Sequence, residues 1–219
     1  MGAQFNWRMG FFWQHGKTTP PNRLWSTSLY TKVLIKGETW APFSTVTDLV
    51  NGWGLRYQPD LYLLPQAIGK GTVICSAYSI PTDLSQTKID VYPSVNGGKT
   101  WSFLSTVASG GVALSNNGET PIWEPFMMVY DNQLVMYYSD QRDPAYGQKI
   151  VHEVSADGVT WGPVVNDIAY STYEHRPRMP TVAALPNGQY IITYEYGLGP
   201  NPTGSGAFIL TYYLQPPHI

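Results

Sequence analysis

Two glutamates in aromatic-rich segments are the residues best suited to carry chemistry. Glu124 lies in the segment Trp123–Phe126, and Glu195 lies in the segment Thr193–Gly197. Burial among apolar side chains raises the pKa of a carboxyl group, because it disfavours the charged form. One such group can stay protonated as a general acid while a second attacks or activates water, as in the hydrolysis of glycosidic bonds. We therefore treat Glu124 and Glu195 as the candidate catalytic pair.

Each glutamate has a defined place in a repeated pair of predicted strands. Glu124 comes directly before the proline that opens a strand, the place held by Gln58 and Met179 in the other two copies. Glu195 comes near the end of a second strand, in the slot that corresponds to Ser139. Both carboxyl groups are therefore expected to face one cavity. The predicted first strands are 59–65, 125–132 and 180–188, and the second strands are 72–79, 133–139 and 189–196.

A turn motif recurs between these strand pairs. The segments Ser94–Trp101 and Ser155–Trp161 fit the Asp-box pattern Ser-x-Asp-x-Gly-x-Thr-Trp, with Asn96 at the acidic position of the first and one residue missing from the second. A third copy survives only as Gly37–Trp40. Asn-Gly and Asp-Gly supply the positive φ angles of tight turns, and the tryptophan is expected to pack between neighbouring sheets. Turn chemistry explains every residue of the motif, so we expect it to be structural.

The spacing of the three tryptophans predicts an all-β propeller. They are 61 and 60 residues apart, a period typical of one four-stranded blade. At this period 219 residues make about three and a half to four blades, whereas rings usually close with about four to eight. The chain is therefore expected to be either a compressed four-bladed ring or a piece of a larger one. We expect residues 1–39 to be a poorly matching N-terminal segment with part of a first blade. Residues 40–219 should form the blades, with Asp boxes near 94–101 and 155–161, and an incomplete C-terminal end.

The composition of the chain indicates which classes of binding partner to expect. The chain carries 13 Lys and Arg against 15 Asp and Glu, a net charge of −2, which disfavours nucleic acid and anionic membranes and fits a neutral substrate. Aromatic residues make up 14% of the chain, which favours β-structure and sugar-stacking surfaces. The single cysteine, Cys75, excludes an internal disulfide. The four histidines have no partners at ligand spacing, so we expect no metal and no cofactor. No export signal is recognisable, and no apolar stretch approaches the roughly 20 residues of a membrane helix.

Seven further side chains are candidates for substrate binding, and most have a structural alternative. Asp140 and Arg142 could bind sugar hydroxyls, or form a charge-paired loop. Glu124 could instead form a strand-end hydrogen bond or an ion pair with Arg142. Arg176 occupies the entry to a strand, and aromatic residues flank both glutamates. The candidates are Gln58, Trp123, Asp140, Arg142, Arg176, Tyr194 and Tyr196.

Several segments together resemble the exo-α-1,5-L-arabinanases of glycoside hydrolase family 93. The resemblance rests on Trp123–Phe126, Tyr138–Asp143 and Thr193–Gly197, together with Gly147–Lys149, Arg176–Pro177 with Met179, and Leu185–Gly188, and it spans about residues 40–213. It implies a secreted six-bladed propeller of the sialidase-like type, acting as a monomer on arabinan. It also implies release of arabinobiose from chain ends with retention of configuration, with Glu124 as acid/base and Glu195 as nucleophile. A six-bladed ring needs about 360 residues at this period, so the resemblance implies a truncated member.

Two other functions remain open. A sialidase needs an arginine cluster, for which Arg56, Arg142 and Arg176 are available, but the usual Arg-Ile-Pro signature is replaced by Arg178–Pro180. A carbohydrate-binding or inactive propeller fragment is the third reading. The missing blades favour it, because stacked repeats need their neighbours.

Overall fold

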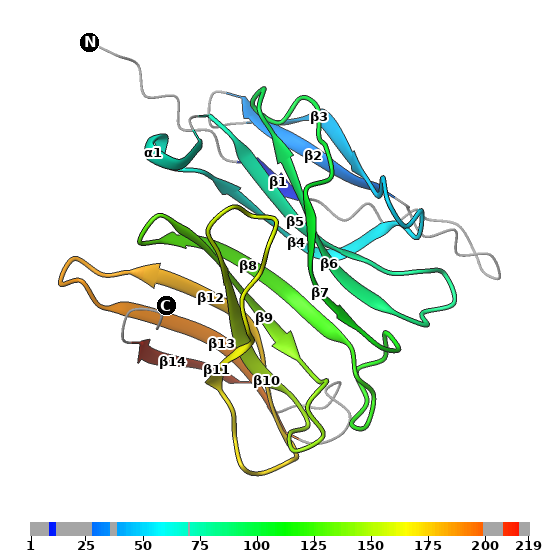
Figure 1. The fold of residues 1–219 in the computed structure, drawn as a ribbon, viewed down its shortest axis with the longest axis vertical. Coiled ribbons are helices and arrows are strands. Elements are labelled where there is room, and N and C mark those ends of the chain that lie inside the picture. Colours follow the sequence, from blue (N-terminus) through cyan, green and yellow to red (C-terminus); the bar gives the residue numbers. More distant parts are fainter. Residues whose placement is uncertain (1–8, 12–27, 36–38, 70, 199–207, 215–219) are drawn as a thin grey trace.

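A computed structural model of the chain describes residues 9–11, 28–35, 39–69, 71–198 and 208–214. These residues form fourteen strands in four antiparallel sheets and one short helix, α1 (Gln66–Gly69). The sheets follow one another in chain order, each made of consecutive strands, as the blades of a propeller do (Figure 1). Two have four strands and two have three. The prediction of an all-β propeller with about three and a half to four blades is confirmed.

The strands have the following bounds. The first sheet holds β1 (Met9–Phe11), β2 (Ser28–Ile35) and β3 (Thr39–Thr47), and the second holds β4 (Leu55–Leu63), β5 (Val73–Ser79), β6 (Thr87–Ser94) and β7 (Ser105–Gly110). The third holds β8 (Ile122–Tyr130), β9 (Gln133–Asp140), β10 (Lys149–Ser155) and β11 (Val165–Ile168). The fourth holds β12 (His175–Ala184), β13 (Tyr190–Leu198) and β14 (Phe208–Leu214). The predicted boundary between an N-terminal segment, residues 1–39, and the blades, residues 40–219, stays a prediction. In the structure β2 and β3 pair with each other across this boundary.

The two Asp boxes connect the last two strands of the second and third sheets. Asp157 accepts hydrogen bonds from the backbone N–H groups of Val159 and Thr160, at 2.8 Å each. Asn96 does the same for Lys99 and Thr100, at 3.1 and 3.0 Å. The amide oxygen therefore replaces the carboxylate of the motif without loss of the turn.

The tryptophan of each box contacts the preceding blade. Trp161 donates from Nε1 to Ser105 Oγ on β7, at 3.1 Å, and the same hydroxyl donates to the carbonyl of Gly158 at 2.6 Å. Trp101 repeats the arrangement with Ser44 on β3, at 3.0 Å. The expectation that these tryptophans pack between sheets is confirmed. One serine hydroxyl thus joins the turn of a blade to the outer strand of its neighbour.

Substitution of Ser105 by alanine should lower the free energy of unfolding by about 1–3 kcal/mol. The change leaves Trp161 Nε1 and the Gly158 carbonyl without their partner in a buried setting. Urea denaturation of Ser105→Ala and of the exposed control Ser102→Ala measures the effect. Equal denaturation midpoints for both variants would show that the interblade bond adds nothing to stability.

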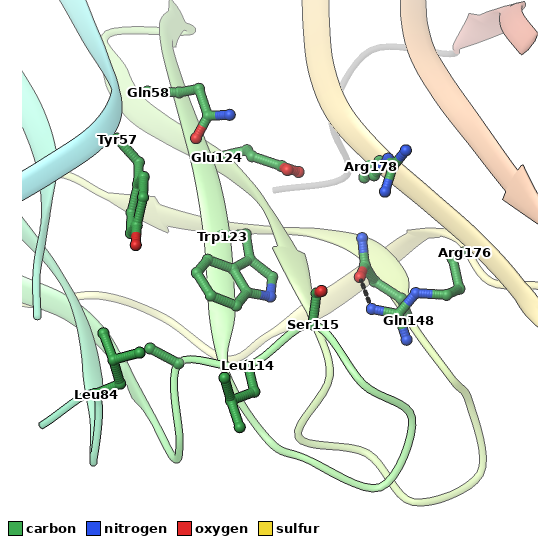
Figure 2. Close-up of a pocket in the computed structure, with 11 residues that line it drawn as sticks. Tyr57, Gln58, Leu84, Leu114, Ser115, Trp123, Glu124, Gln148, Arg176 and Arg178 are labelled. Atoms are coloured by element: carbon green, nitrogen blue, oxygen red, sulfur yellow. Dashed lines mark hydrogen bonds between the residues drawn. The ribbon is translucent and has the colours of Figure 1, made fainter. Parts of the chain in front are cut away.

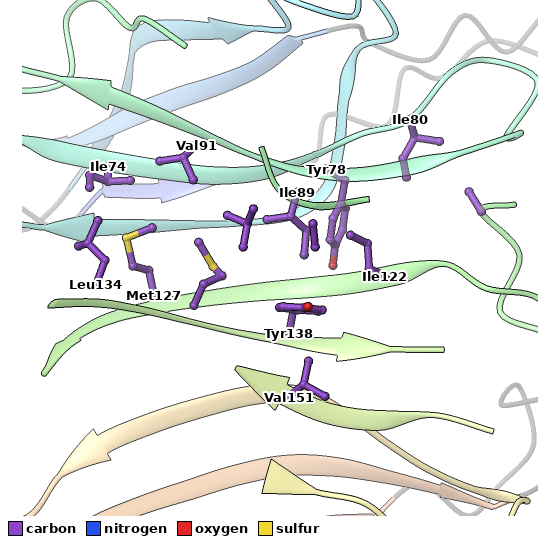
Figure 3. Packing of buried hydrophobic residues seen from close by; sticks show 14 residues of the cluster. Ile74, Tyr78, Ile80, Ile89, Val91, Ile122, Met127, Leu134, Tyr138 and Val151 are labelled. Carbon is purple, nitrogen blue, oxygen red and sulfur yellow. The ribbon is translucent and has the colours of Figure 1, made fainter. Parts of the chain in front are cut away.

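Among the described residues the hydrophobic core lies between blades and forms three clusters. One, between the second and third sheets, includes Ile74, Tyr78, Met127 and Tyr138 (Figure 3). Another, between the third and fourth sheets, includes Val135, Tyr137, Ile192 and Tyr194, and the last joins β3 to the second sheet through Val46, Leu55 and Tyr92. Each blade is therefore stabilised by its neighbours. Among the described residues no helix is long and apolar enough to cross a membrane.

A bulge interrupts the first strand of the second, third and fourth sheets. In β8, Glu124 and Pro125 lie opposite the single residue Tyr138, and in β12, Met179 and Pro180 lie opposite Tyr194. Glu124 and Met179 have positive φ angles, of 59° and 54°. Non-glycine residues rarely adopt this conformation, and here it belongs to a bulge that recurs in three successive sheets.

The bulge of β4 contains one more residue than the other two. Its register skips Tyr57, Gln58 and Pro59, and the positive φ angle, 63°, is at Tyr57. The backbone conformation therefore makes Tyr57 the equivalent of Glu124. The sequence alone aligns Glu124 with Gln58, because each residue directly precedes a proline. That alignment is wrong for β4 because its bulge contains one more residue before the proline.

Candidate active site

A cavity of about 370 Å³ lies among the bulges of β4, β8 and β12. Its lining has an apolar part, formed by Tyr57, Trp123 and the loop residues Leu84, Ala113 and Leu114, and a polar part that includes Gln148, Arg176 and Arg178 (Figure 2). Glu124 stands between the two parts. The lining residues are Tyr57, Gln58, Leu84, Ala113, Leu114, Ser115, Trp123, Glu124, Gln148, Arg176 and Arg178.

Glu124 is held through one of its two carboxyl oxygens. Its Oε2 atom accepts a hydrogen bond from Ser139 Oγ and another from the backbone N–H of Met179, both at 2.7 Å. Burial raises the pKa of Glu124. The two hydrogen bonds and the charge of Arg178 offset this only in part, and the negative charge of Glu195 adds to it. The group is therefore suited to carry a proton above the usual pH range of glutamate.

Glu195 is held by a two-pronged ion pair. Arg178 donates from Nε to Oε2 at 2.9 Å and from Nη2 to Oε1 at 2.8 Å. The two residues are also register partners on β12 and β13. A bidentate guanidinium is a partner of the ionised carboxylate and fixes its plane. The two candidate carboxyl groups thus have different surroundings, and they are near enough to influence each other electrostatically.

The apolar part of the cavity is an aromatic wall. The rings of Tyr57 and Trp123 have centroids 6.5 Å apart, and both contact the buried ring of Tyr78 at 6.2 and 6.1 Å. Edge contacts of this kind hold the rings rigidly. The predicted binding residues Gln58 and Trp123 both line the cavity. An aromatic face and a nearby amide are groups that bind sugar rings and hydroxyls.

Arg176 forms the floor of the polar part and is 1% exposed. It donates to Gln148 Oε1 at 2.7 Å, to Gln141 Oε1 at 2.8 Å and to the carbonyl of Gly147 at 3.2 Å, and also to Asn117 Oδ1. All four acceptors are neutral. Burial lowers its pKa to about 10, which leaves it cationic at neutral pH. Gln141 Oε1 also accepts from Trp123 Nε1, so the network joins the floor to the aromatic wall.

Asp140 and Arg142, two predicted binding residues, pair with each other outside the cavity lining. The Arg142 side chain donates to both oxygens of Asp140 at 2.9 Å and to Tyr138 Oη at 2.6 Å. Tyr138 in turn donates to Glu153 at 2.5 Å. The alternative of an ion pair between Glu124 and Arg142 is wrong, because Asp140 lies two residues from Arg142 and takes its guanidinium.

Tyr194 and Tyr196 flank Glu195 in the sequence but belong to the cluster between the third and fourth sheets. Tyr194 is 1% exposed and shares a hydrogen bond with Tyr170 Oη at 2.6 Å, and Tyr196 shares one with His175 at 2.8 Å. Successive side chains of a strand point to opposite faces, so these rings do not surround the Glu195 carboxyl. Neither lines the cavity.

Arg178 is a cavity residue that is not among the catalytic or binding residues predicted from the sequence, although the sequence places it at the entry to a strand. It lines the cavity, pairs with Glu195 and influences the charge of Glu124. Its position directly before the Met179–Pro180 bulge was the available signal. The arginine cluster that a sialidase needs is not assembled here. Of the three arginines available for it, only Arg176 lines this cavity; Arg56 and Arg142 do not. Arg56 instead donates to Trp53 O and Thr82 Oγ1.

Metal ligands are not grouped in the described part of the chain: no three His, Cys, Asp or Glu side chains lie close enough together to hold an ion. The groups that line the cavity include one carboxyl, that of Glu124, with two guanidiniums, amides and aromatic rings. The expectation that both carboxyls face one cavity is met only in part, because Glu195 is not among the lining residues and is connected to them through Arg178. A carboxyl in such a lining is suited to proton transfer to a neutral, hydroxyl-rich molecule.

Three similar solved structures are of enzymes from Penicillium chrysogenum and Fusarium graminearum. It is 45% identical to an alpha-L-arabinanase of Penicillium chrysogenum in complex with arabinobiose, with a TM-score of 0.83, over 90% of this chain and 57% of that one. It is 51% identical to the GH93 alpha-L-arabinofuranosidase of Fusarium graminearum in complex with arabinobiose, with a TM-score of 0.79, over 88% and 55% of the two chains. The Fusarium arabinofuranosidase bound to an iminosugar inhibitor is 49% identical, with a TM-score of 0.82, over 94% and 57%.

The chain thus spans somewhat more than half the length of these enzymes. A sialidase of Streptococcus pneumoniae matches at 16% identity with a TM-score of 0.54, a likeness of fold alone. No protein-family model and no curated protein matches the chain.

Proposed function

The aligned part of this chain belongs to glycoside hydrolase family 93, and on that premise we propose that the protein is a retaining exo-arabinanase. It would release arabinobiose from the ends of linear α-1,5-arabinan. The observation that carries the proposal is the pair of carboxyl groups in unlike settings, Glu124 with a raised pKa and Glu195 in a bidentate ion pair. Complexes of both similar fungal enzymes with arabinobiose support the substrate class.

Each group has a separate task in the proposed reaction. Glu124 donates its proton to the leaving glycosidic oxygen while a Glu195 oxygen attacks the anomeric carbon. The carbon–oxygen bond to the leaving chain breaks and a glycosyl ester forms on Glu195. Glu124, now ionised, takes a proton from water, which attacks the ester and frees the sugar with its configuration retained. A retaining site of this kind holds its carboxyl groups about 5–5.5 Å apart.

The cavity lining suits a neutral sugar. Tyr57 and Trp123 present apolar ring faces, on which the C–H faces of a furanose can stack. Both terminal nitrogens of Arg176 donate to neutral acceptors, and its Nε has no hydrogen-bond partner, so the floor of the cavity contains no carboxylate paired with this arginine. We also infer that the enzyme acts as a monomer outside the cell, where an insoluble or very large polysaccharide is found.

Incubation of the 219-residue chain with debranched arabinan tests the proposal. We expect arabinobiose as the main product from the start of the reaction, because an exo-acting enzyme cuts two residues from each end. Anion-exchange chromatography identifies the product, and proton NMR of its first-formed anomer reports retention. Release of sialic acid from a sialoside would favour the sialidase reading, and binding of arabino-oligosaccharide without turnover would favour the non-catalytic one.

A further inference from the structure

We propose that the β12 bulge positions both candidate catalytic carboxyl groups at once, with Arg178 as the positioning residue; the inference rests on the proposed function. Arg178 and Met179 are joined by one peptide bond. The first holds Glu195 through its side chain, and the second holds Glu124 through its backbone N–H. The relative placement of the two carboxyl groups is therefore set by one peptide unit.

The bulge makes this double contact possible. A regular strand would place Arg178 and Met179 on opposite faces of the sheet. Here Met179 has a φ angle of 54°, and Met179 and Pro180 together oppose only Tyr194. The N–H of Met179 consequently leaves the β12–β13 ladder and reaches Glu124 Oε2 on β8, at 2.7 Å. The bulge thus links the fourth sheet to the third at the site of the proposed reaction.

The guanidinium of Arg178 binds both carboxyl oxygens of Glu195, so it orients this carboxyl group and also supplies a positive charge beside it. Both nitrogen-to-oxygen distances, 2.8 and 2.9 Å, are typical of charge-assisted hydrogen bonds. The pair is largely sheltered, because the Arg178 side chain is 16% exposed and that of Glu195 is 27% exposed. Lysine would retain the charge but would lose the second bond.

Arg178 also acts on Glu124 through its charge. The guanidinium lowers the pKa of Glu124 against the larger effect of burial, and Figure 2 shows the Glu124 carboxyl directed toward Arg178. One guanidinium therefore holds Glu195 in a bidentate ion pair and limits how strongly Glu124 holds its proton. The charged and titratable groups that influence Glu124 are Tyr78 on β5, Arg176 and Arg178 on β12, and Glu195 on β13.

Two substitutions at position 178 separate charge from geometry. Arg178→Gln removes both, and we expect kcat on debranched arabinan to fall by about 10²-fold with little change in KM, because the carboxylate loses its orientation. The fall in kcat should be smaller for Arg178→Lys, which retains the charge. The alkaline limb of the pH profile should move to higher pH in Arg178→Gln, since Glu124 loses a nearby cation, and should stay in place in Arg178→Lys. Lys99→Gln, which removes an exposed cation on the Asp-box turn, is the control and should match the wild type.

A measurement without substrate keeps this inference separate from the proposed function. Carbon-13 NMR titration of the Glu124 side-chain carboxyl should give a higher pKa in Arg178→Gln than in the wild type, and no change in Lys99→Gln. An unchanged Glu124 titration in Arg178→Gln overturns the inference, whether or not the chain cleaves arabinan. A wild type that releases no arabinobiose counts against the proposed function alone. Equal loss of kcat in both Arg178 variants with an unmoved alkaline limb would reduce Arg178 to a structural role.

Discussion

Replacement of Glu124 by glutamine is expected to lower kcat/KM on debranched arabinan by about 10²- to 10⁴-fold, the range for loss of a general acid. Glutamine retains the shape and can still accept from Ser139 and Met179, so the fold should be unaffected. The amide has no acidic proton to transfer to the leaving sugar oxygen. The alkaline limb that Glu124 imposes on the wild type should also disappear. Because burial raises the pKa of Glu124, that limb should lie above the usual range of a glutamate.

A substrate with a good leaving group separates the roles of the two glutamates. A dinitrophenyl arabinobioside needs no protonation to depart, so Glu124→Gln should release dinitrophenol in a first turnover close in rate to that of the wild type. Glu195→Gln lacks the nucleophile and should fail on both substrates. If the two variants behave in the opposite way, the assigned roles are exchanged. If neither variant loses activity on arabinan, the pair is not catalytic.

Replacement of Arg176 by methionine is expected to lower the free energy of unfolding by about 3 kcal/mol or more. Methionine fills much of the volume but leaves Asn117, Gln141, Gln148 and the Gly147 carbonyl without their shared donor inside the protein. Each hydrogen bond to a charged group contributes about 1.5–3 kcal/mol, and the four are not additive. Urea denaturation measures the loss.

Lys99→Met is the matched control for that experiment, because the side chain is exposed and lies on the Asp-box turn away from the cavity. It should shift stability by less than about 0.5 kcal/mol. A loss for Arg176→Met as small as that of the control would mean that the network is satisfied by water once the arginine is gone. The aromatic wall would then be independent of the floor, despite the shared acceptor Gln141.

The repeated elements of the fold could be predicted from the sequence because their causes are local. Asn96 and Asp157 form their turns with residues two to four positions away, so the pattern carries its own geometry. The contact of Trp101 and Trp161 with the preceding blade follows from the same periodicity. The serines that receive these contacts, Ser44 and Ser105, have no signature of their own and emerge only from packing.

The site was predicted less completely, because bulges and alternation decide which side chains meet. The extra residue in the β4 bulge shifts Tyr57 into the place expected for Gln58. Tyr194 is adjacent to Glu195 in the chain but points into the core, as period-two alternation requires. The pairing of Arg178 with Glu195 depends on strand register, and the contact of Glu124 with Met179 depends on how two sheets approach. Neither is encoded within one segment.

The bulges of β4, β8 and β12 occupy equivalent backbone positions in three successive blades, and the cavity lies among them. Tyr57, Glu124 and Met179 share the positive φ angle, yet one contributes an aromatic face, one an acid and one a backbone donor. Duplication of a blade copies the backbone and leaves the side chain at this position open to change. New chemistry can therefore arise at such a cavity by single substitutions, with no remodelling of the scaffold.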